Sequence, residues 1–547
     1  MFGFLTPVRN EASYPLADAA AAQSFWQTLP GNDAIGAQEA ISKALAQPVP
    51  RGIPNGNRLQ AVLLLDQGAR MLVDALLSNG NAASLQAGAT ATRSWQAAFE
   101  LCRSFGRAYA QFLRSIRENR EFEDRLEHQA LVLLRFFRQR QLELLLRPFS
   151  DERAPAFSWK EIHDAYALAQ ARGLHREVLP VKRDQTPGAV EARLDREYLH
   201  LLMQELMNGA QFPPYEASWV NQRLPRWGLA LALKSDEGPA GSYRFVVDPR
   251  SDAGLVRSNG EPVKGSLCLD LTPVLKSLSA QIASLRDARD RPGEGSAFRR
   301  GRELKLLQKV SELCLAEPPP ISRRGERRPT AVTVEVAVGL SDVLRRVRSK
   351  PEDLVAAPSL PTRGSEGLTI SGFGATTGQG AVTVMQSSTG APLLTMVDQS
   401  DSGCRLQGAA FVGHPAIPGA LIAFREDESE AWSLAVVRRV KKRLAGRRIE
   451  IGVEYLGMGP RWVVIVVPDP DGKAADNELP RFAGLYLPES SEHPLLPIKT
   501  LVLPACGLSP GDRLSVRSRM SMHTVRLKEP LEEQADFIWS PFEILDR

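Results

Sequence analysis

Three short polar motifs in the C-terminal half of the chain carry residue types that bind an anionic nucleotide. They are the arginine-rich stretch RRGERR, the stretch DQSDSG and the stretch IGVEYLG. A guanidinium group offers a planar pair of donors that fits a phosphate, or the O6/N7 edge of guanine, in a way that lysine cannot reproduce. An aspartate can accept from the donor edge of the same base, a serine hydroxyl adds an adaptable partner, and glycine permits a tight turn. These residue types predict a site for an anionic nucleotide.

The first two motifs supply the candidate binding residues, and the third supplies a strand end beside them. The candidates are Arg323, Arg324, Arg327, Arg328, Asp398, Ser400 and Gly403. The spacing RxxxR occurs twice, as Arg323/Arg327 and as Arg324/Arg328, and both registers remain open. About 70 residues separate the arginines from Asp398. A Ser/Thr/Gly-rich tract at about 356–392 accounts for that distance if it forms a mobile looped-out insertion.

Each motif adjoins a segment with the pattern of a β-strand. The arginines precede TAVTVEVAVGL (330–340), DQSDSG precedes another strand, and IGVEYLG ends the strand RRIEIGVEYLG (447–457). The segments ALIAFRE (420–426) and AWSLAVVRRV (431–440) show the same character. Many short strands with turns between them indicate β-barrels or sandwiches. The arginines can therefore fold over a ligand that rests on a sheet.

The order of the motifs resembles that of the PilZ family of cyclic di-GMP receptors. The family pattern is RxxxR, then [D/N]xSxxG, then a strand end similar to GxEFxG, and AWSLAVVRRV resembles its tryptophan-containing strand. The resemblance covers about residues 321–460. It implies an antiparallel β-barrel, cyclic di-GMP as the ligand with no further cofactor, and binding by the seven candidate residues. It also implies an output such as control of motility, adhesion or surface structures, through a protein partner bound by the helical half.

Two alternatives to a receptor remain open. The first is a structural adaptor, in which a degenerate PilZ-like fold no longer binds nucleotide. The second is an enzyme with its active site in residues 1–315. In that region no set of residues forms a recognisable catalytic motif. The GGDEF and EAL motifs of cyclic di-GMP synthesis and hydrolysis are not seen. We therefore expect a protein without catalytic activity, which reads the messenger and neither makes nor destroys it.

The remaining chain predicts a multidomain α+β protein. A helical bundle should come first, with helices near 92–118, 121–148, 159–172 and 190–208, and a PilZ-like antiparallel β-barrel and a further β-rich segment should follow. The segment WGLALAL (227–233) has the composition of a strand. The expected units are 1–57 (partly helical), 58–224 (helical bundle), 225–316 (mixed α/β), 317–460 (PilZ-like barrel with its insertion) and 461–547 (β-rich domain or extension of the barrel).

Composition argues against several other classes of protein, including nucleic-acid-binding, metal-binding and membrane proteins. The formal net charge of +5, from 68 basic and 63 acidic residues, is too small to argue for binding to a nucleic-acid polymer. The five cysteines and seven histidines are scattered without the spacing of metal ligands, so no metal site is expected. His163 is interpreted as a packing or surface residue. No signal peptide or apolar run of roughly 20 residues is present, so no membrane span and a cytoplasmic location are expected.

Overall fold

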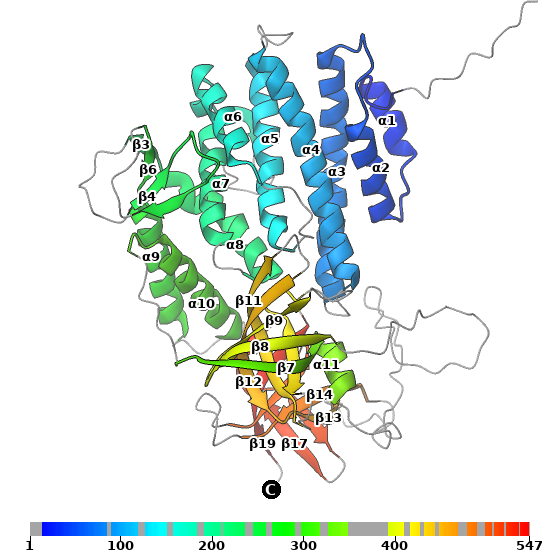
Figure 1. The fold of residues 1–547 in the computed structure, drawn as a ribbon, viewed down its shortest axis with the longest axis vertical. Helices are drawn as coiled ribbons and strands as arrows, with labels where there is room; N and C mark the ends of the chain where they lie inside the picture. Colours follow the sequence, from blue (N-terminus) through cyan, green and yellow to red (C-terminus); the bar gives the residue numbers. More distant parts are fainter. Residues whose placement is uncertain are drawn as a thin grey trace, which may run out of the picture.

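A computed structural model shows a helical unit joined to a pair of β-barrels (Figure 1). The structure describes residues 14–84, 89–118, 126–149, 157–182, 191–208, 212–235, 244–258, 265–289, 297–317, 326–347, 392–409, 416–426, 431–443, 448–468, 479–489, 498–505, 508–518, 521–534 and 536–545. Arg323, Arg324 and all but the last residue of the predicted insertion at 356–392 lie outside these ranges.

Long helices stand side by side in the N-terminal unit (Figure 1). They are α1 (Ala19–Gln27), α2 (Ala34–Ala46), α3 (Asn55–Ser84), α4 (Ala89–Arg117), α5 (Leu126–Leu146), α6 (Trp159–Ala171), α7 (Leu194–Asn208) and α8 (Pro214–Trp227). The four helices predicted by range correspond to α4, α5, α6 and α7. Helix α8 was not predicted, since it contains an internal proline, Pro225, which sequence patterns treat as a helix breaker.

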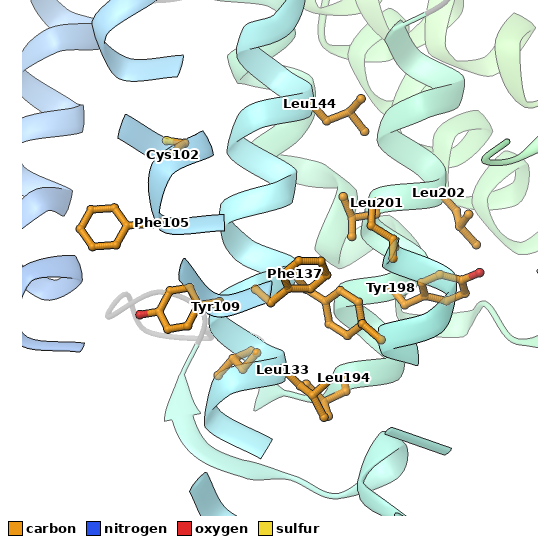
Figure 2. Close-up of a cluster of buried hydrophobic side chains, with 14 of the residues drawn as sticks. Cys102, Phe105, Tyr109, Leu133, Phe137, Leu144, Leu194, Tyr198, Leu201 and Leu202 are labelled. Atoms are coloured by element: carbon orange, nitrogen blue, oxygen red, sulfur yellow. The ribbon is translucent and has the colours of Figure 1, made fainter. Parts of the chain in front are cut away.

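The apolar stripes of α4, α5 and α7 meet in the core of the helical unit (Figure 2). Phe105, Tyr109, Phe137 and Tyr198 are almost completely buried there. Charged side chains are also buried in this unit, and one of them is Asp66 of α3. Its carboxylate accepts from the Tyr109 hydroxyl at 2.8 Å and from the Gln139 amide at 2.6 Å. Burial raises the pKa of Asp66 to about 6. A single apolar cluster therefore holds the helices together, and the Asp66 carboxylate within it has hydrogen-bond partners.

A small sheet and two further helices complete this unit. Besides the short pair β1 (Leu179–Lys182) and β2 (Glu191–Ala192), the strands are β3 (Leu233–Ser235), β4 (Arg244–Val247), β5 (Val256–Ser258) and β6 (Leu267–Leu269), in the order β3-β6-β4-β5. They are followed by α9 (Thr272–Arg289) and α10 (Ala297–Cys314). The apolar cluster that begins at Leu16 extends to Cys314.

The prediction of a strand over WGLALAL was wrong for most of its length. Helix α8 ends at Trp227, a short 3-10 turn covers Gly228–Ala230, and β3 begins only at Leu233. Trp227 and Leu231 are both buried in the helical core. A short apolar run does not by itself distinguish a strand from a buried turn, because burial alone demands the apolar residues.

The first barrel is a closed antiparallel sheet of six strands. They are β7 (Arg328–Val338), β8 (Leu393–Ser400), β9 (Gly403–Ala409), β10 (Leu421–Glu426), β11 (Ser433–Arg443) and β12 (Arg448–Met458). Their order is β10-β11-β12-β9-β8-β7, and pairing of β7 with β10 closes the ring. Alternate residues point inward to form its core, including Val336, Leu406, Ile451 and Tyr455.

The last β-rich segment closes a second sheet of its own. Its strands are β13 (Arg461–Val466), β14 (Arg481–Leu487), β15 (Thr500–Pro504), β16 (Arg513–Arg517), β17 (Met522–Leu527), β18 (Glu532–Glu533) and β19 (Phe537–Ile544). Pairing of β15 with β19 closes six of them into a barrel, and β18 lies along β19. The two barrels bury a common apolar cluster, which includes Leu421 and Leu434 from the first and Leu487 and Phe537 from the second.

Helix α11 (Leu340–Val347), which follows β7, packs into the same interface. Its first backbone N–H, that of Leu340, donates to the Asp536 carboxylate of the second barrel at 3.0 Å. Asp536 is partly buried in this interface, and desolvation of its carboxylate raises its pKa from the usual 3.8 to about 6. The carboxylate therefore joins the two barrels, and its charged form is disfavoured by desolvation.

Asp536 should make the stability of the protein depend on pH. Its folded pKa is above its unfolded value, so the folded state holds the proton more tightly between about pH 4 and pH 6. The free energy of unfolding should then fall by up to about 3 kcal/mol as pH rises through that window. Asp536→Asn keeps an oxygen for Leu340 and cannot ionise. Denaturant unfolding at pH 4 and pH 7 should show a smaller pH-dependent loss in this variant, and an unchanged loss would contradict the assignment.

None of the helices in the described part of the chain has both the length and the hydropathy needed to cross a bilayer.

Candidate functional site

Strand pairing brings the first two motifs together at one end of the first barrel. In β7 and β8, Pro329 pairs with Asp398 and Arg328 pairs with Gln399. In the hairpin of β8 and β9, Asp398 pairs with Arg405. Residues that are about 70 positions apart in the sequence are therefore neighbours on the sheet, as a common site requires.

Asp398 is the centre of this arrangement. Arg327 donates from Nη1 to Asp398 Oδ1 at 2.8 Å, and Arg405 Nη2 lies 2.7 Å from Asp398 Oδ2. The Asp398 side chain is only 10% exposed, whereas that of Arg327 is 52% exposed. A nearly buried carboxylate thus positions two guanidinium groups that keep contact with solvent. Both groups can still donate to an incoming anion, because each has five N–H donors.

Arg405 was not among the predicted site residues. It also lies 3.4 Å from Glu450 Oε1 on β12, so two carboxylates hold its guanidinium. The sequence does contain a signal for it: Arg405 lies two positions after Gly403 on the same strand, and residues two apart on a strand share a face. That signal becomes useful only when the face of the sheet that carries the site is known.

The turn between β8 and β9 is shaped by Ser400 and Gly403. The Ser400 hydroxyl donates to the Gly403 carbonyl at 3.1 Å, and the Tyr455 backbone N–H donates to Ser402 O at 3.0 Å. A Cβ on Gly403 would lie 2.0 Å from the Val453 carbonyl oxygen, which is backbone of β12. Glycine is therefore required here by the packing of two strands, independently of any ligand.

A second glycine leaves an open surface beside Asp398. Gly452 of β12 pairs with Arg405 on β9 and with Arg439 on β11. A Cβ at Gly452 would meet only the Arg439 Cβ, at 3.5 Å. Directly paired residues share a face of the sheet, so two arginines flank a patch of bare backbone. We call Gly452 with Arg405 and Arg439 the glycine ledge, and its flat surface can accommodate a planar base.

Some of the predicted site residues lie together in the structure, and others lie at the edge of this group or have another role. Arg327, Asp398, Ser400 and Gly403 lie together as described, while Arg328 begins β7 beside them. In the third motif, Glu454 pairs with Gly403 across the two strands. The other conspicuous residue of that motif, Gly457, has a packing role: a Cβ there would lie 3.1 Å from Leu487 of the second barrel.

Residues that could suggest other chemistry have structural roles. His163 Nδ1 lies 2.7 Å from the Tyr198 hydroxyl and Nε2 lies 2.8 Å from Ala253 O, so the predicted packing role is the one observed. Cys404 is buried beneath the site, and burial raises its pKa to about 12, which is unsuited to a nucleophile. Over the described ranges, no group of three or more His, Cys, Asp or Glu side chains could hold a metal ion.

The fold and the candidate site together define an α+β protein whose first barrel carries an arginine-rich face around Asp398. Residues 20–237 match the family model described as "Cyclic-di-GMP receptor FimW, N-terminal domain". The matched model thus describes the N-terminal domain of a receptor for the same ligand that the motifs led us to expect. The matched residues run from α1 to β3, within the helical unit, and make up less than half of the chain. A search of curated proteins finds no significant match to the chain.

Proposed function

We propose that the chain is a cyclic di-GMP receptor that binds the nucleotide on the outer face of its first, PilZ-like barrel. The observation that carries this proposal is the pairing of Asp398 with both Arg327 and Arg405 beside the open backbone of Gly452. The family match of the helical unit supports the same ligand independently of the barrel.

The chemistry of the site suits the two halves of the ligand. The half-exposed guanidinium groups can form bidentate contacts with a phosphate or with the O6/N7 edge of a guanine. Asp398 retains lone pairs beyond the two that its arginines use, so it can also accept from N1–H or the exocyclic amine of that base. The Ser400 hydroxyl lies in the same turn. Adenine presents a different donor and acceptor pattern, so guanine should be preferred.

The arginine-rich segment adds a means of coupling. Glu326 and Arg327 lie immediately before β7, in the connection between the helical unit and the barrel. Ligand contact with Arg327 and with the arginines upstream in the motif would link the ligand to this connection. In the receptor we propose, which has no catalytic step of its own, this contact shifts the helical unit toward a state that binds a protein partner. Control of motility, adhesion or surface structures is the corresponding output.

Calorimetric titration of the full chain tests the proposal. Cyclic di-GMP should bind with one site on the first barrel, and cyclic di-AMP should bind much more weakly, because it lacks the guanine edges. Circular dichroism recorded on the same sample shows that the chain is folded. Folded protein that gives no heat with tens of micromolar cyclic di-GMP would support the structural adaptor with a degenerate PilZ-like fold.

A further inference from the structure

Arg438, next to the glycine ledge, forms an ion-pair network that connects the first barrel to the second. Arg438 of β11 donates from Nη1 and Nη2 to the two carboxylate oxygens of Glu532 of β18, at 2.6 Å and 2.5 Å. It also donates from Nε to Glu454 of β12 at 2.7 Å. The guanidinium and the Glu532 carboxylate thus face each other in the bidentate geometry that arginine also uses for phosphate.

Arg438 borders the proposed ligand surface. It is adjacent in the chain to Arg439, which flanks Gly452, and its partner Glu454 pairs with Gly403 of the ligand-binding turn. The Arg438 side chain is 40% exposed, whereas that of Glu532 is only 12% exposed. An anion approaching from solvent can therefore reach the Arg438 guanidinium. The Glu532 carboxylate, which is bound to the same guanidinium, lies on the side that faces the protein.

Glu532 also lies at a junction of three parts of the fold. Gln534 donates from Nε2 to Glu532 Oε1 at 2.6 Å, and a Cβ on Gly419 of the first barrel would lie 2.5 Å from Gln534 Oε1 and 3.0 Å from Pro213 Cγ. Pro213 directly precedes α8. On the other side, Lys305 of α10 lies 3.5 Å from Leu531 O. The segment that contains β18 therefore contacts both the first barrel and the helical unit.

We propose that Glu532 is an internal competitor for the ligand: it occupies the guanidinium of Arg438 in the free protein, and a phosphate of the nucleotide takes its place on binding. This inference rests on the proposed function of the ledge. Both anions use the same planar donor pair, so they exclude each other. Exchange would leave Glu532 without its strongest partner and would weaken the attachment of the two-residue strand β18, which also contacts the helical unit.

Affinity measurements on the full chain test the competition. Glu532→Gln removes the competing charge and should tighten binding of cyclic di-GMP by about twofold to fivefold, since a partly exposed ion pair contributes up to about a fivefold step. Glu529→Gln is the matched control, because it removes the same charge from an exposed position of the same segment. It should leave the affinity unchanged.

A second background separates competition from a general effect of charge. Arg438→Gln should weaken binding, and Glu532→Gln should have no effect when added to it. The proposal would be overturned if Glu532→Gln raised the affinity for cyclic di-GMP equally with and without Arg438. It would also be overturned if Glu532→Gln did not raise the affinity in the wild-type background. Wild-type chain that does not bind cyclic di-GMP would instead overturn the proposed function itself, so the two failures are distinguishable.

Hydrogen exchange provides a direct readout of β18. In the free protein the Leu531 N–H donates to Trp539 O and the Gln534 N–H donates to Phe537 O, both at 2.8 Å. If the ligand displaces Glu532, these two amides should exchange faster in the complex, while amides in the interior of β19 should not change. Slower or unchanged exchange at both positions would overturn the release of β18.

Discussion

Replacement of Asp398 by alanine should reduce the affinity for cyclic di-GMP by about a hundredfold. The carboxylate holds Arg327 at 2.8 Å and Arg405 at 2.7 Å, so its loss frees two cationic groups that the ligand needs in fixed positions. It also removes the proposed acceptor for the guanine base. One charge-assisted contact is worth about 1.5–3 kcal/mol, and the upper end of that range corresponds to about a hundredfold in affinity.

The adjacent Asp401 provides the matched control for this experiment. It is exposed in the same turn, so Asp401→Ala removes an equal charge without removing the contacts of Asp398. Calorimetry should show nearly wild-type affinity for Asp401→Ala and an intermediate loss for Asp398→Asn, which keeps an acceptor oxygen but not the charge. Equal losses for Asp401→Ala and Asp398→Ala would show that only the net charge of the turn matters, and that the site lies elsewhere.

Gly403→Ala should strongly destabilise the β half of the protein. The added methyl group would lie 2.0 Å from Val453 O and 3.0 Å from Val453 C, and both are backbone atoms that cannot rotate away. Strands β9 and β12 would have to separate, which would disturb the pair of Gly403 with Glu454 and the hydrogen bond from Tyr455 N to Ser402 O. Overpacking of this kind costs about 1–3 kcal/mol or more, so thermal unfolding should shift down by roughly 5–10 °C.

Gly452→Ala should have the opposite profile. Its methyl group would meet only the Arg439 Cβ, at an ordinary 3.5 Å, so the melting temperature should stay near that of the wild type. Because Gly452 forms the open surface of the ledge, the affinity for cyclic di-GMP should nevertheless fall. Unchanged affinity in Gly452→Ala would move the ligand away from the ledge. A wild-type melting temperature in Gly403→Ala would contradict the steric argument for the turn.

The long elements of this fold could be predicted from the sequence because their patterns are local. Helices α4, α5, α6 and α7 repeat apolar residues every three or four positions, and the strands around 330–340 and 447–457 alternate. The prediction of WGLALAL as a strand was wrong, since Trp227 and Leu231 are buried in the helical core. Helix α8 was not predicted at all, since it contains Pro225. The closure of two separate barrels depends on pairs such as β7 with β10 and β15 with β19, which no local pattern reveals.

The sequence by itself determined which residue types make up the candidate site and in what order: arginines, then Asp398 and its turn, then a strand end with Gly452 and Glu454. These are properties of motifs, and short motifs keep their local chemistry in any context. Only the tertiary structure decided that Arg405 and Arg439 flank a bare backbone, and that Arg438 is held by Glu532 of the second barrel. Those contacts join segments that lie far apart in the chain, and strand register and barrel packing, which arise from the whole fold, bring them together.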